Sequence, residues 1–306
     1  MPDGEIDAPL RIIPGVQTDT PRETLQSQRV AIHRCERGAL RSASDIVALE
    51  EPLEIRLDCA QPDGRMVRSL SITMRTPGSD EELAAGFLLA EGVVHDPCDI
   101  ERIRPCGLDD GIHGARNAVR VRLADHVRVD WPTIERHVGI TSSCGVCGKN
   151  SLDALELRGL RPAPRASFRV GASTLSGLPD RLRAAQRVFE QTGGLHAAAL
   201  FDAQGELLDI REDVGRHNAV DKLLGAQFLR GAMPLTDRLL FLSGRVSFEL
   251  MQKALVAGLP AVVAVGAPSS LAVEMARRFD MTLIGFVRGD RFNAYHGEWR
   301  VEPDQP

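Results

Sequence analysis

The sequence predicts a mixed α/β protein in which a smaller α+β domain precedes a three-layer α/β domain. The chain has 306 residues, of which 43% are hydrophobic and 26% are charged, and this length and composition suit two globular domains. In the first half, alternation of apolar and polar residues predicts strands around a helix. In the second half, short apolar runs alternate with helical patterns, which is typical of parallel strands covered by helices on both faces.

Changes in composition predict the domain boundaries. Residues 1–27 are polar, contain four prolines and show no period, so we expect a mobile tail. The N-terminal α+β domain is expected at 28–137, followed at 138–172 by a loop with a Cys-x-x-Cys pair and a linker. The C-terminal α/β domain is then 173–306.

Strands dominate the first domain. Runs at 30–34, 53–58 and 67–74 have strand composition, and the last two alternate across Pro62-Asp63-Gly64, which predicts a hairpin. Apolar residues at 119, 121 and 123 predict a further strand.

One helix is expected between these strands. Ser79 with Glu82 three residues later is typical of a capping box at a helix start. Leu83, Phe87 and Ala90 supply its apolar face, and Gly92 is expected to end it.

The second domain has a regular order of elements. Pro179 suits the first turn of a helix that ends at 193–194, and a hairpin of strands follows at 195–201 and 206–210. The later elements are helices at 217–229, 247–257 and 270–279 and strands at 238–242, 261–265 and 282–287. This order, α-β-β-α-β-α-β-α-β, is that of cytidine-deaminase-like folds, which we therefore expect here.

Charge and the N-terminus exclude several classes of protein. The net charge is −5, so the chain has no basic field for binding nucleic acid without sequence preference. The first residues, MPDGEIDAPL, do not have the pattern of a signal peptide, and the longest apolar run, 259–268, is too short to span a bilayer. We expect a cytosolic protein without nucleic-acid or membrane partners, whose six cysteines are mostly reduced.

Cys144 and Cys147 form a Cys-Gly-Val-Cys pair in the glycine-rich segment 138–150, VGITSSCGVCGKN. In such pairs one thiol is often acidified, and a thiolate is both a nucleophile and a metal ligand. The residues alone leave three uses open. These are a structural zinc site, thioredoxin-like redox exchange, and the relay of sulfane sulfur as a persulfide.

A zinc site would need two more ligands. Only Cys98 and Cys106, with His95 or His113, could supply them, and their spacing is irregular. We therefore expect no metal bound by this chain. A zinc deaminase is also excluded, because the helix expected at 217 lacks the His-x-Glu pattern that deaminases need.

Redox exchange and sulfur relay require different local structure around the cysteine pair. A thioredoxin-like pair is expected at a strand-to-helix turn early in the fold, unlike this one. A carrier thiol must visit a donor and an acceptor, and Gly139, Gly145 and Gly148 would permit residues 140–150 to move between them.

Polar, glycine-containing segments occur at four expected strand ends in the second domain. They are TGGLH at 192–196, EDVGRHN at 212–218, SGR at 243–245 and FVRGDR at 286–291. Ligands of open α/β sheets bind at the carboxyl ends of the parallel strands, where helix N-termini present free N–H groups. His196 taken alone is typical of a hydrogen-bonded core histidine.

Arginines in these segments indicate the charge of the ligand. Arg216, Arg245, Arg288 and Arg291 could each bind phosphate through two hydrogen bonds. Asp290 could accept hydrogen bonds from a guanine edge or a ribose hydroxyl. Together the segments predict a large polyanionic ligand that contains nucleotides.

In combination, these segments resemble the FdhD family of formate dehydrogenase accessory sulfur carriers. The resemblance extends from about residue 28 to 295. Its motifs are SSCGVCG at 142–148, TGGLH at 192–196, EDVGRHNAVDK at 212–222, SGRVSFE at 243–249 and GFVRGDRFN at 285–293.

The resemblance implies a homodimer with a cytidine-deaminase-like C-terminal domain. It implies that a cysteine desulfurase supplies sulfur as a persulfide on Cys144, with Cys147 as its partner residue. The sulfur would pass to the molybdenum or tungsten bis(guanine dinucleotide) cofactor that formate dehydrogenase requires. The cofactor-binding residues would be Phe286, Val287, Arg288, Gly289, Asp290 and Arg291. The alternative is a protein that only binds the cofactor and whose cysteine pair is incidental or holds zinc.

Overall fold

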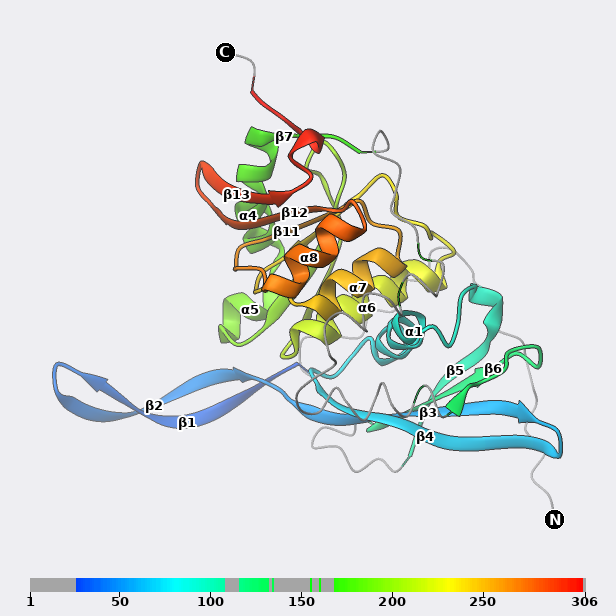
Figure 1. Ribbon diagram of the computed structural model, residues 1–306. Helices are drawn as coiled ribbons and strands as arrows, with labels where there is room; N and C mark the ends of the chain where they lie inside the picture. Colours follow the sequence, from blue (N-terminus) through cyan, green and yellow to red (C-terminus); the bar gives the residue numbers. More distant parts are fainter. Residues whose placement is uncertain are drawn as a thin grey trace.

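The structure, a computed structural model, describes residues 26–107, 116–131, 134, 155, 160 and 168–304. It is built from two main sheets separated by helices, with a long two-stranded arm projecting from the body (Figure 1). The expectation of a mobile tail at 1–27 falls mostly outside the described residues.

A four-stranded sheet forms most of the N-terminal half, in the order β4-β3-β6-β5. Its strands are β3 (Glu51–Gln61), β4 (Gly64–Arg75), β5 (Ile100–Cys106) and β6 (Ala118–Leu123), with the short 3-10 helix η2 (Pro97–Asp99) before β5. Leu53, Ile55 and Leu57 of β3 point to one face and are fully buried against helix α1 (Asp80–Glu91). The predicted hairpin at 53–74 and the strand at 119–123 are confirmed.

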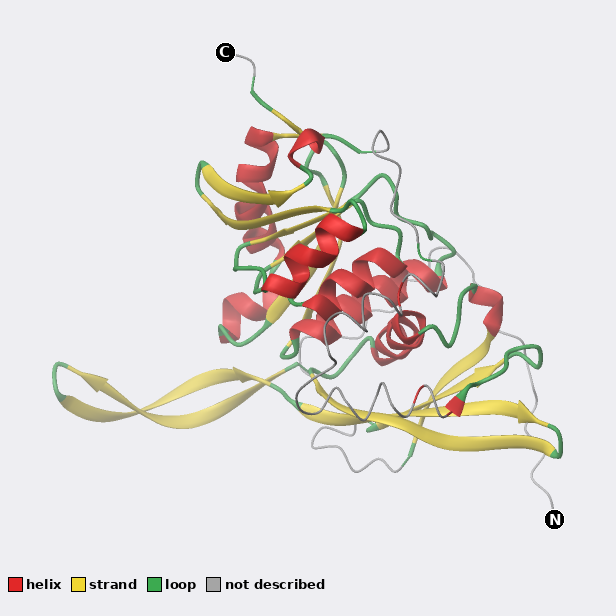
Figure 2. Cartoon of the chain, in the orientation of Figure 1, coloured by secondary structure: helices red, strands yellow, loops and turns green. Residues whose placement is uncertain are grey.

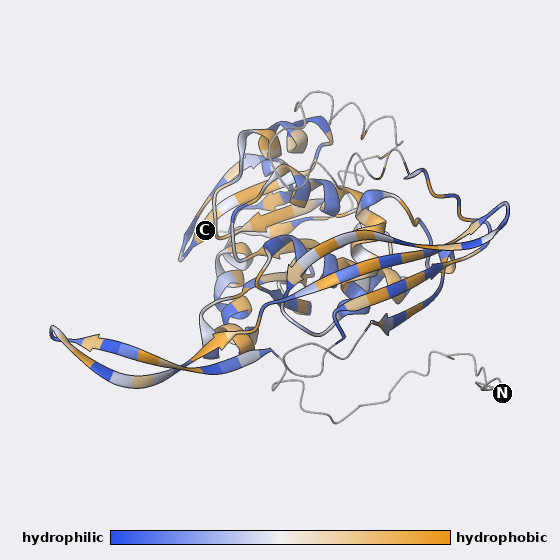
Figure 3. Cartoon of the chain, turned by 90° about the horizontal axis from the view of Figure 1, so that it is seen from below, coloured by the Kyte–Doolittle hydropathy of each residue, from blue (hydrophilic) through white to orange (hydrophobic). Residues whose placement is uncertain are grey.

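The arm is the hairpin of β1 (Ser27–Glu36) and β2 (Ala39–Ala48). Figure 2 shows its far end extending away from the body, whereas β2 also contacts α5. Figure 3 shows hydrophobic and hydrophilic residues interspersed along it. The strand at 30–34 was expected, whereas β2 was not. Most side chains of both strands are exposed. Because β2 has no buried face, its sequence does not need to alternate between apolar and polar residues, and that alternation is the pattern from which a strand is predicted.

The start of α1 differs from the predicted capping box. Ser79 has φ 56°, in the left-handed region, and its side chain accepts no capping hydrogen bond. The Glu82 carboxylate instead pairs with Arg211, with Nε to Oε2 at 2.6 Å. The predicted end is confirmed, because the Gly92 N–H donates to Leu88 and Leu89 carbonyls.

The C-terminal half contains a six-stranded sheet in the order β13-β12-β11-β10-β8-β9, in which β10, β11 and β12 are parallel. The strands are β8 (His196–Phe201), β9 (Leu207–Asp213), β10 (Leu239–Leu242), β11 (Ala261–Ala264), β12 (Thr282–Arg288) and β13 (Arg291–His296). The helices are α4 (Ala172–Ala185), α5 (Arg187–Thr192), α6 (Arg216–Leu229), α7 (Phe248–Val256) and α8 (Ser270–Arg278). The chain closes with η4 (Glu298–Arg300) and β14 (Val301–Glu302), which pairs with β7 (Val170–Gly171).

Helices cover both faces of this sheet. Helix α4 packs on one face, over a core that includes Phe201 and Phe241, whereas α6, α7 and α8 pack on the other, over Leu240 and Val262 (Figure 1). This is the expected three-layer arrangement, and the predicted α/β fold class is confirmed. The closer likeness to cytidine-deaminase folds stays a prediction.

Some elements of this half differ from expectation. Pro179 lies inside α4, which begins at Ala172, within the span expected to be linker. Phe168 and Val170, also in that span, are buried in the core beneath α4. Strands β13, β14 and β7 were not predicted. In the described ranges, no helix is long and apolar enough to span a membrane.

The two halves meet where α1 crosses α6 at a pair of glycines. A Cβ atom on Gly86 would lie 1.9 Å from the carbonyl oxygen of Asp221, and one on Gly225 would lie 1.8 Å from that of Glu82. Only residues without a side chain allow the two backbones to approach this closely.

We therefore expect Gly225→Ala to lower the free energy of unfolding by about 1–3 kcal/mol, because the added methyl group must push the helices apart. Gly177→Ala in α4 is the matched control. Apart from its own helix backbone and chain neighbours, no atom lies within 4 Å of its Cβ position, so alanine should be neutral or stabilise the helix. Urea unfolding measures both, and equal midpoints would contradict the close crossing.

Candidate functional site

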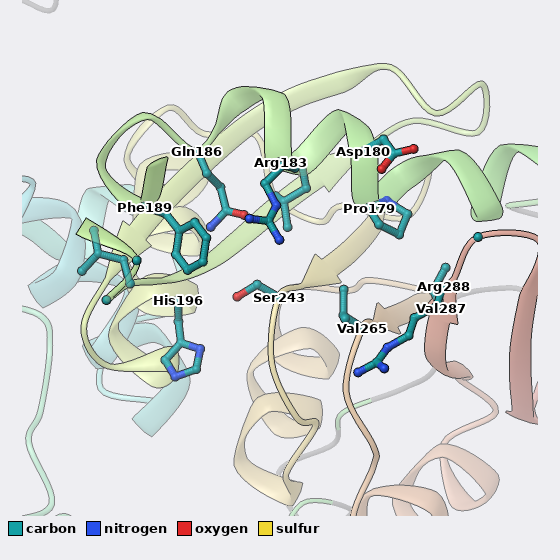
Figure 4. Close-up of a pocket in the computed structure, with 15 residues that line it drawn as sticks. Pro179, Asp180, Arg183, Gln186, Phe189, His196, Ser243, Val265, Val287 and Arg288 are labelled. Atoms are coloured by element: carbon teal, nitrogen blue, oxygen red, sulfur yellow. The ribbon is translucent and has the colours of Figure 1, made fainter. Parts of the chain in front are cut away.

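A pocket of about 540 Å³ lies at the carboxyl ends of β10, β11 and β12. Helices α4 and α5 form its other wall, and Figure 4 shows side chains from both sides facing the same space. Its lining residues are Pro179, Asp180, Leu182, Arg183, Gln186, Phe189, Gly193, Gly194, Leu195, His196, Ser243, Val265, Val287, Arg288 and Gly289. This volume is typical of a site for one small ligand.

Three of the four segments predicted from the sequence meet at this pocket. They are 192–196, 243–245 and 286–291, which contribute His196, Ser243 and Arg288 among others. They converge because β8 runs antiparallel to β10, so that the start of β8 lies at the same edge as the ends of β10 and β12.

The turns after β10, β11 and β12 are joined through their backbones. The Gly266 N–H donates to the Gly244 carbonyl at 3.2 Å, and the Phe286 N–H donates to the Gly266 carbonyl at 3.2 Å. A Cβ atom on Gly266 would lie 2.6 Å from the Gly244 oxygen. Glycine at 244 and 266 therefore allows these turns to pack closely against one another at the carboxyl edge of the sheet.

The residues at 286–291 occupy different positions relative to the pocket. Val287, Arg288 and Gly289 line it. Phe286 has φ 56° and is 42% exposed. Asp290 lies in the turn between β12 and β13, Arg291 begins β13, and neither lines the pocket. Arg288 is therefore the arginine of this segment that is placed to bind a ligand there.

The opposite wall carries a stacked pair. The Arg183 guanidinium lies over the Phe189 ring, 5.1 Å from its centroid. Glu212 on β9 holds this wall, because its carboxylate accepts the N–H groups of Val188 at 3.2 Å and Phe189 at 3.0 Å. Burial raises the pKa of Glu212, and these hydrogen bonds oppose that rise.

His196 belongs to one of the four segments predicted to bind a ligand, although taken alone it is typical of a core histidine. It is half-buried and lines the pocket. Burial lowers its pKa, and the positive charges of Arg216 and Arg245 lower it further, against an opposing effect of Asp213. The neutral imidazole is therefore favoured. The neighbouring Ser243 hydroxyl accepts the Ala197 N–H at 2.8 Å.

The fourth segment, 212–218, which is part of the motif 212–222, does not line the pocket. It supplies instead a buried polar network to the N-terminal half. The Asp213 carboxylate accepts from Lys222 Nζ at 2.7 Å and from the Thr76 N–H at 3.1 Å. Asn218 Nδ2 donates to the Met74 carbonyl at 2.7 Å. These residues fix the end of β4 to the start of α6.

His217 lies next to this network at the start of α6. Its Nε2 is 3.3 Å from the Ser247 hydroxyl and 3.9 Å from the Glu249 carboxylate. Burial and the charges of Lys253 and Arg216 lower its pKa to about 4. Unlike His196, it does not line the pocket.

Cys144 and Cys147, and the predicted motion of residues 140–150, lie outside the described residues. Ile134 and Leu155, described on either side, are buried in different cores. Ile134 packs with the four-stranded sheet and α1, and Leu155 packs with α6 and α7. The described residues on either side of the cysteine pair therefore belong to different halves of the molecule.

Cys98 and Cys106 cannot complete a zinc site together. Cys98 lies in η2 before β5, and Cys106 is the last residue of β5. A strand rises about 3.3 Å per residue, so roughly 20 Å separates the two residues. The pairing considered for a four-ligand zinc site is thus ruled out by geometry.

Fold and pocket together define an α/β protein with a pocket at the carboxyl ends of parallel strands, where proteins of this class bind ligands. A sequence model of the FdhD/NarQ family matches residues 48–302. The chain belongs to this family, which confirms the resemblance drawn from its motifs.

Relatives named sulfur carrier protein FdhD occur in bacteria and archaea. The protein of Streptomyces coelicolor is 50% identical over 277 residues, covering 90% of this chain and 95% of the relative. That of Mycobacterium tuberculosis is 49% identical over 256 residues, covering 82% and 90%. That of Sulfolobus acidocaldarius is 40% identical over 278 residues, covering 91% and 100%.

The fold also matches a solved structure. A protein from Desulfotalea psychrophila, assigned as a formate dehydrogenase accessory protein, aligns with a TM-score of 0.68 and 24% identity. The alignment covers 90% of this chain and 100% of that one. At this identity the match concerns the fold.

Proposed function

We propose that this protein is a sulfur carrier for formate dehydrogenase maturation. Cys144 accepts sulfane sulfur from a cysteine desulfurase as a persulfide. The protein then delivers the sulfur to the molybdenum or tungsten bis(guanine dinucleotide) cofactor, its substrate, which formate dehydrogenase requires. The observation that carries this proposal is the arginine-bearing pocket in a chain of the FdhD/NarQ family.

The loading step is a thiol exchange. The Cys144 thiolate attacks the outer sulfur of the donor persulfide, and a new S–S bond forms on Cys144 while the donor S–S bond breaks. The donor leaves as a thiolate, and the terminal S–H proton stays on the transferred sulfur. The exchange needs no external oxidant or reductant.

The pocket suits part of a polyanionic ligand. Arg183 and Arg288 offer charge-assisted hydrogen bonds to phosphate, and Arg183 is positioned by its contact with the Phe189 ring. Asp180 is the acidic residue among the lining residues. The wall therefore carries an excess of positive charge, as a ligand with pyrophosphate groups requires.

Intact-mass measurement after incubation with a cysteine desulfurase and cysteine tests the proposal. The chain should gain about 32 Da, one sulfur atom, and dithiothreitol should remove it. A chain that binds guanine nucleotides but never gains this mass would instead be a protein that only binds the cofactor.

The ligand side is tested by Arg288→Ala, with Arg291→Ala as its matched control. A charge-assisted contact to phosphate is typically worth about 1.5–3 kcal/mol, so Arg288→Ala should weaken GDP binding roughly ten- to a hundredfold. Arg291 is the register partner of Arg288 but does not line the pocket, so its variant should bind normally. Calorimetry measures both, and equal affinities would move the phosphate site away from Arg288.

A further inference from the structure

His196 is placed to contact a ligand directly. It begins β8, and its ring packs against Gly244, where a Cβ atom would come within 3.2 Å of Nδ1. Figure 4 shows Ser243 between the His196 ring and Arg288, all at the same edge of the sheet. Within the described residues, neither ring nitrogen has a hydrogen bond from the protein. A ligand group in the pocket could therefore reach them.

Charged groups surround this histidine on several elements. Asp213 is its register partner on β9, Arg216 and His217 begin α6, and Arg245 follows β10. The other charged groups of the pocket wall are Asp180, Arg183 and Arg288. The excess positive charge disfavours an imidazolium in the free protein, and an incoming phosphate would offset it.

We propose that His196 contacts an anionic group of the ligand in this pocket and takes up one proton as that ligand binds. This inference rests on the proposed nucleotide-bearing ligand. An imidazolium donates hydrogen bonds from both ring nitrogens, whereas the neutral ring donates from one, so a phosphate favours the charged form.

The sign of the pH dependence follows from linkage. In the free protein, burial and Arg216 hold the pKa of His196 below its usual value, and a bound anion raises it. Affinity is then greatest below the free-state pKa and falls as the pH rises through the bound-state pKa. Between the two values, one proton changes the affinity by up to about tenfold per pH unit.

The test is calorimetric binding of GDP-mannose. Its pyrophosphate is esterified at both ends and does not titrate near neutral pH, unlike a terminal phosphate with a pKa of about 6. Titrations at pH 7 in buffers of different ionisation enthalpy should show proton uptake, up to about one proton per ligand. Affinity should rise roughly fivefold or more from pH 8 to pH 6, and uptake of one proton limits this rise to about tenfold per pH unit.

Two variants separate His196 from the histidine beside it. His196→Asn should abolish both proton uptake and the pH dependence, and should weaken binding. His217→Asn should retain both, because His217 does not line the pocket. In the unsubstituted protein, the NMR titration of the His196 ring should move to higher pH with ligand, which tests the proposal without a variant.

The outcomes are distinct. Binding without proton uptake, uptake that persists in His196→Asn, or an unmoved NMR titration would each overturn this inference and leave the nucleotide pocket intact. Failure of the unsubstituted protein to bind GDP-mannose would overturn both the inference and the proposed ligand class.

Discussion

Lys222→Met is expected to lower the free energy of unfolding by about 3–5 kcal/mol, the usual result of breaking a buried ion pair. Lys222 is 1% exposed, and its Nζ lies 2.7 Å from both the Asp213 carboxylate and the Thr76 carbonyl. Methionine has a similar volume, so the substitution leaves little cavity. Its cost comes from the Asp213 charge, which stays buried without its cation.

The matched control is Arg230→Met, which removes an ion pair with Asp209 at 2.9 Å from a side chain that is 58% exposed. Exposed pairs contribute about 0–1 kcal/mol, so this variant should unfold close to the parent. Urea unfolding gives both midpoints. Asp213→Asn added to Lys222→Met should recover part of the loss, because the remaining side chain is neutral.

Equal midpoints for Lys222→Met and Arg230→Met would show that the two halves do not depend on this pair. A loss near the expected value would identify the 212–222 segment as the structural joint between β4 and α6. Its polar residues would then have a structural role, stabilising the fold that forms the pocket without contacting a ligand.

The elements that the sequence predicted correctly are those whose patterns are local. The hairpin at 53–74 has a turn sequence at 62–64 and strands with one buried face, so alternation and turn chemistry agree. The alternating helices and strands from 216 to 288 were found for the same reason, since the apolar residues that each buries form a local pattern.

The errors occurred where distant contacts decide the local structure. Pro179 was expected to begin a helix, but α4 begins about two turns earlier, at Ala172, directly after β7, which pairs with β14. Ser79 was expected to cap α1, but Glu82 is drawn to Arg211 on a strand of the other half. Neither partner is close in sequence, so no local pattern indicates it.

The same limit applies to the site. Polar residues after strands were all read as ligand-binding, yet Asp213 and Asn218 face the N-terminal half. His196 taken alone is typical of a core histidine, and only its position in the fold shows that it lines the pocket. A sequence shows that a residue is polar and near a strand end, but only the packing of the two halves decides which surface it faces.

On the proposed function, Cys144→Ala should reduce formate dehydrogenase activation in cells to that of a strain lacking this protein. Alanine removes the sulfur atom on which the persulfide forms, so the variant has no carrier group. The purified variant should gain no mass from a cysteine desulfurase, yet bind GDP as the parent does, because the pocket is built from 179–196, 243, 265 and 287–289.

Cys98→Ala, which removes an exposed thiol elsewhere, is the control and should load and activate normally. A Cys144→Ala chain that loads at Cys147 and still activates the dehydrogenase would move the carrier role to Cys147. One that activates the enzyme without loading at all would identify a protein that only binds the cofactor.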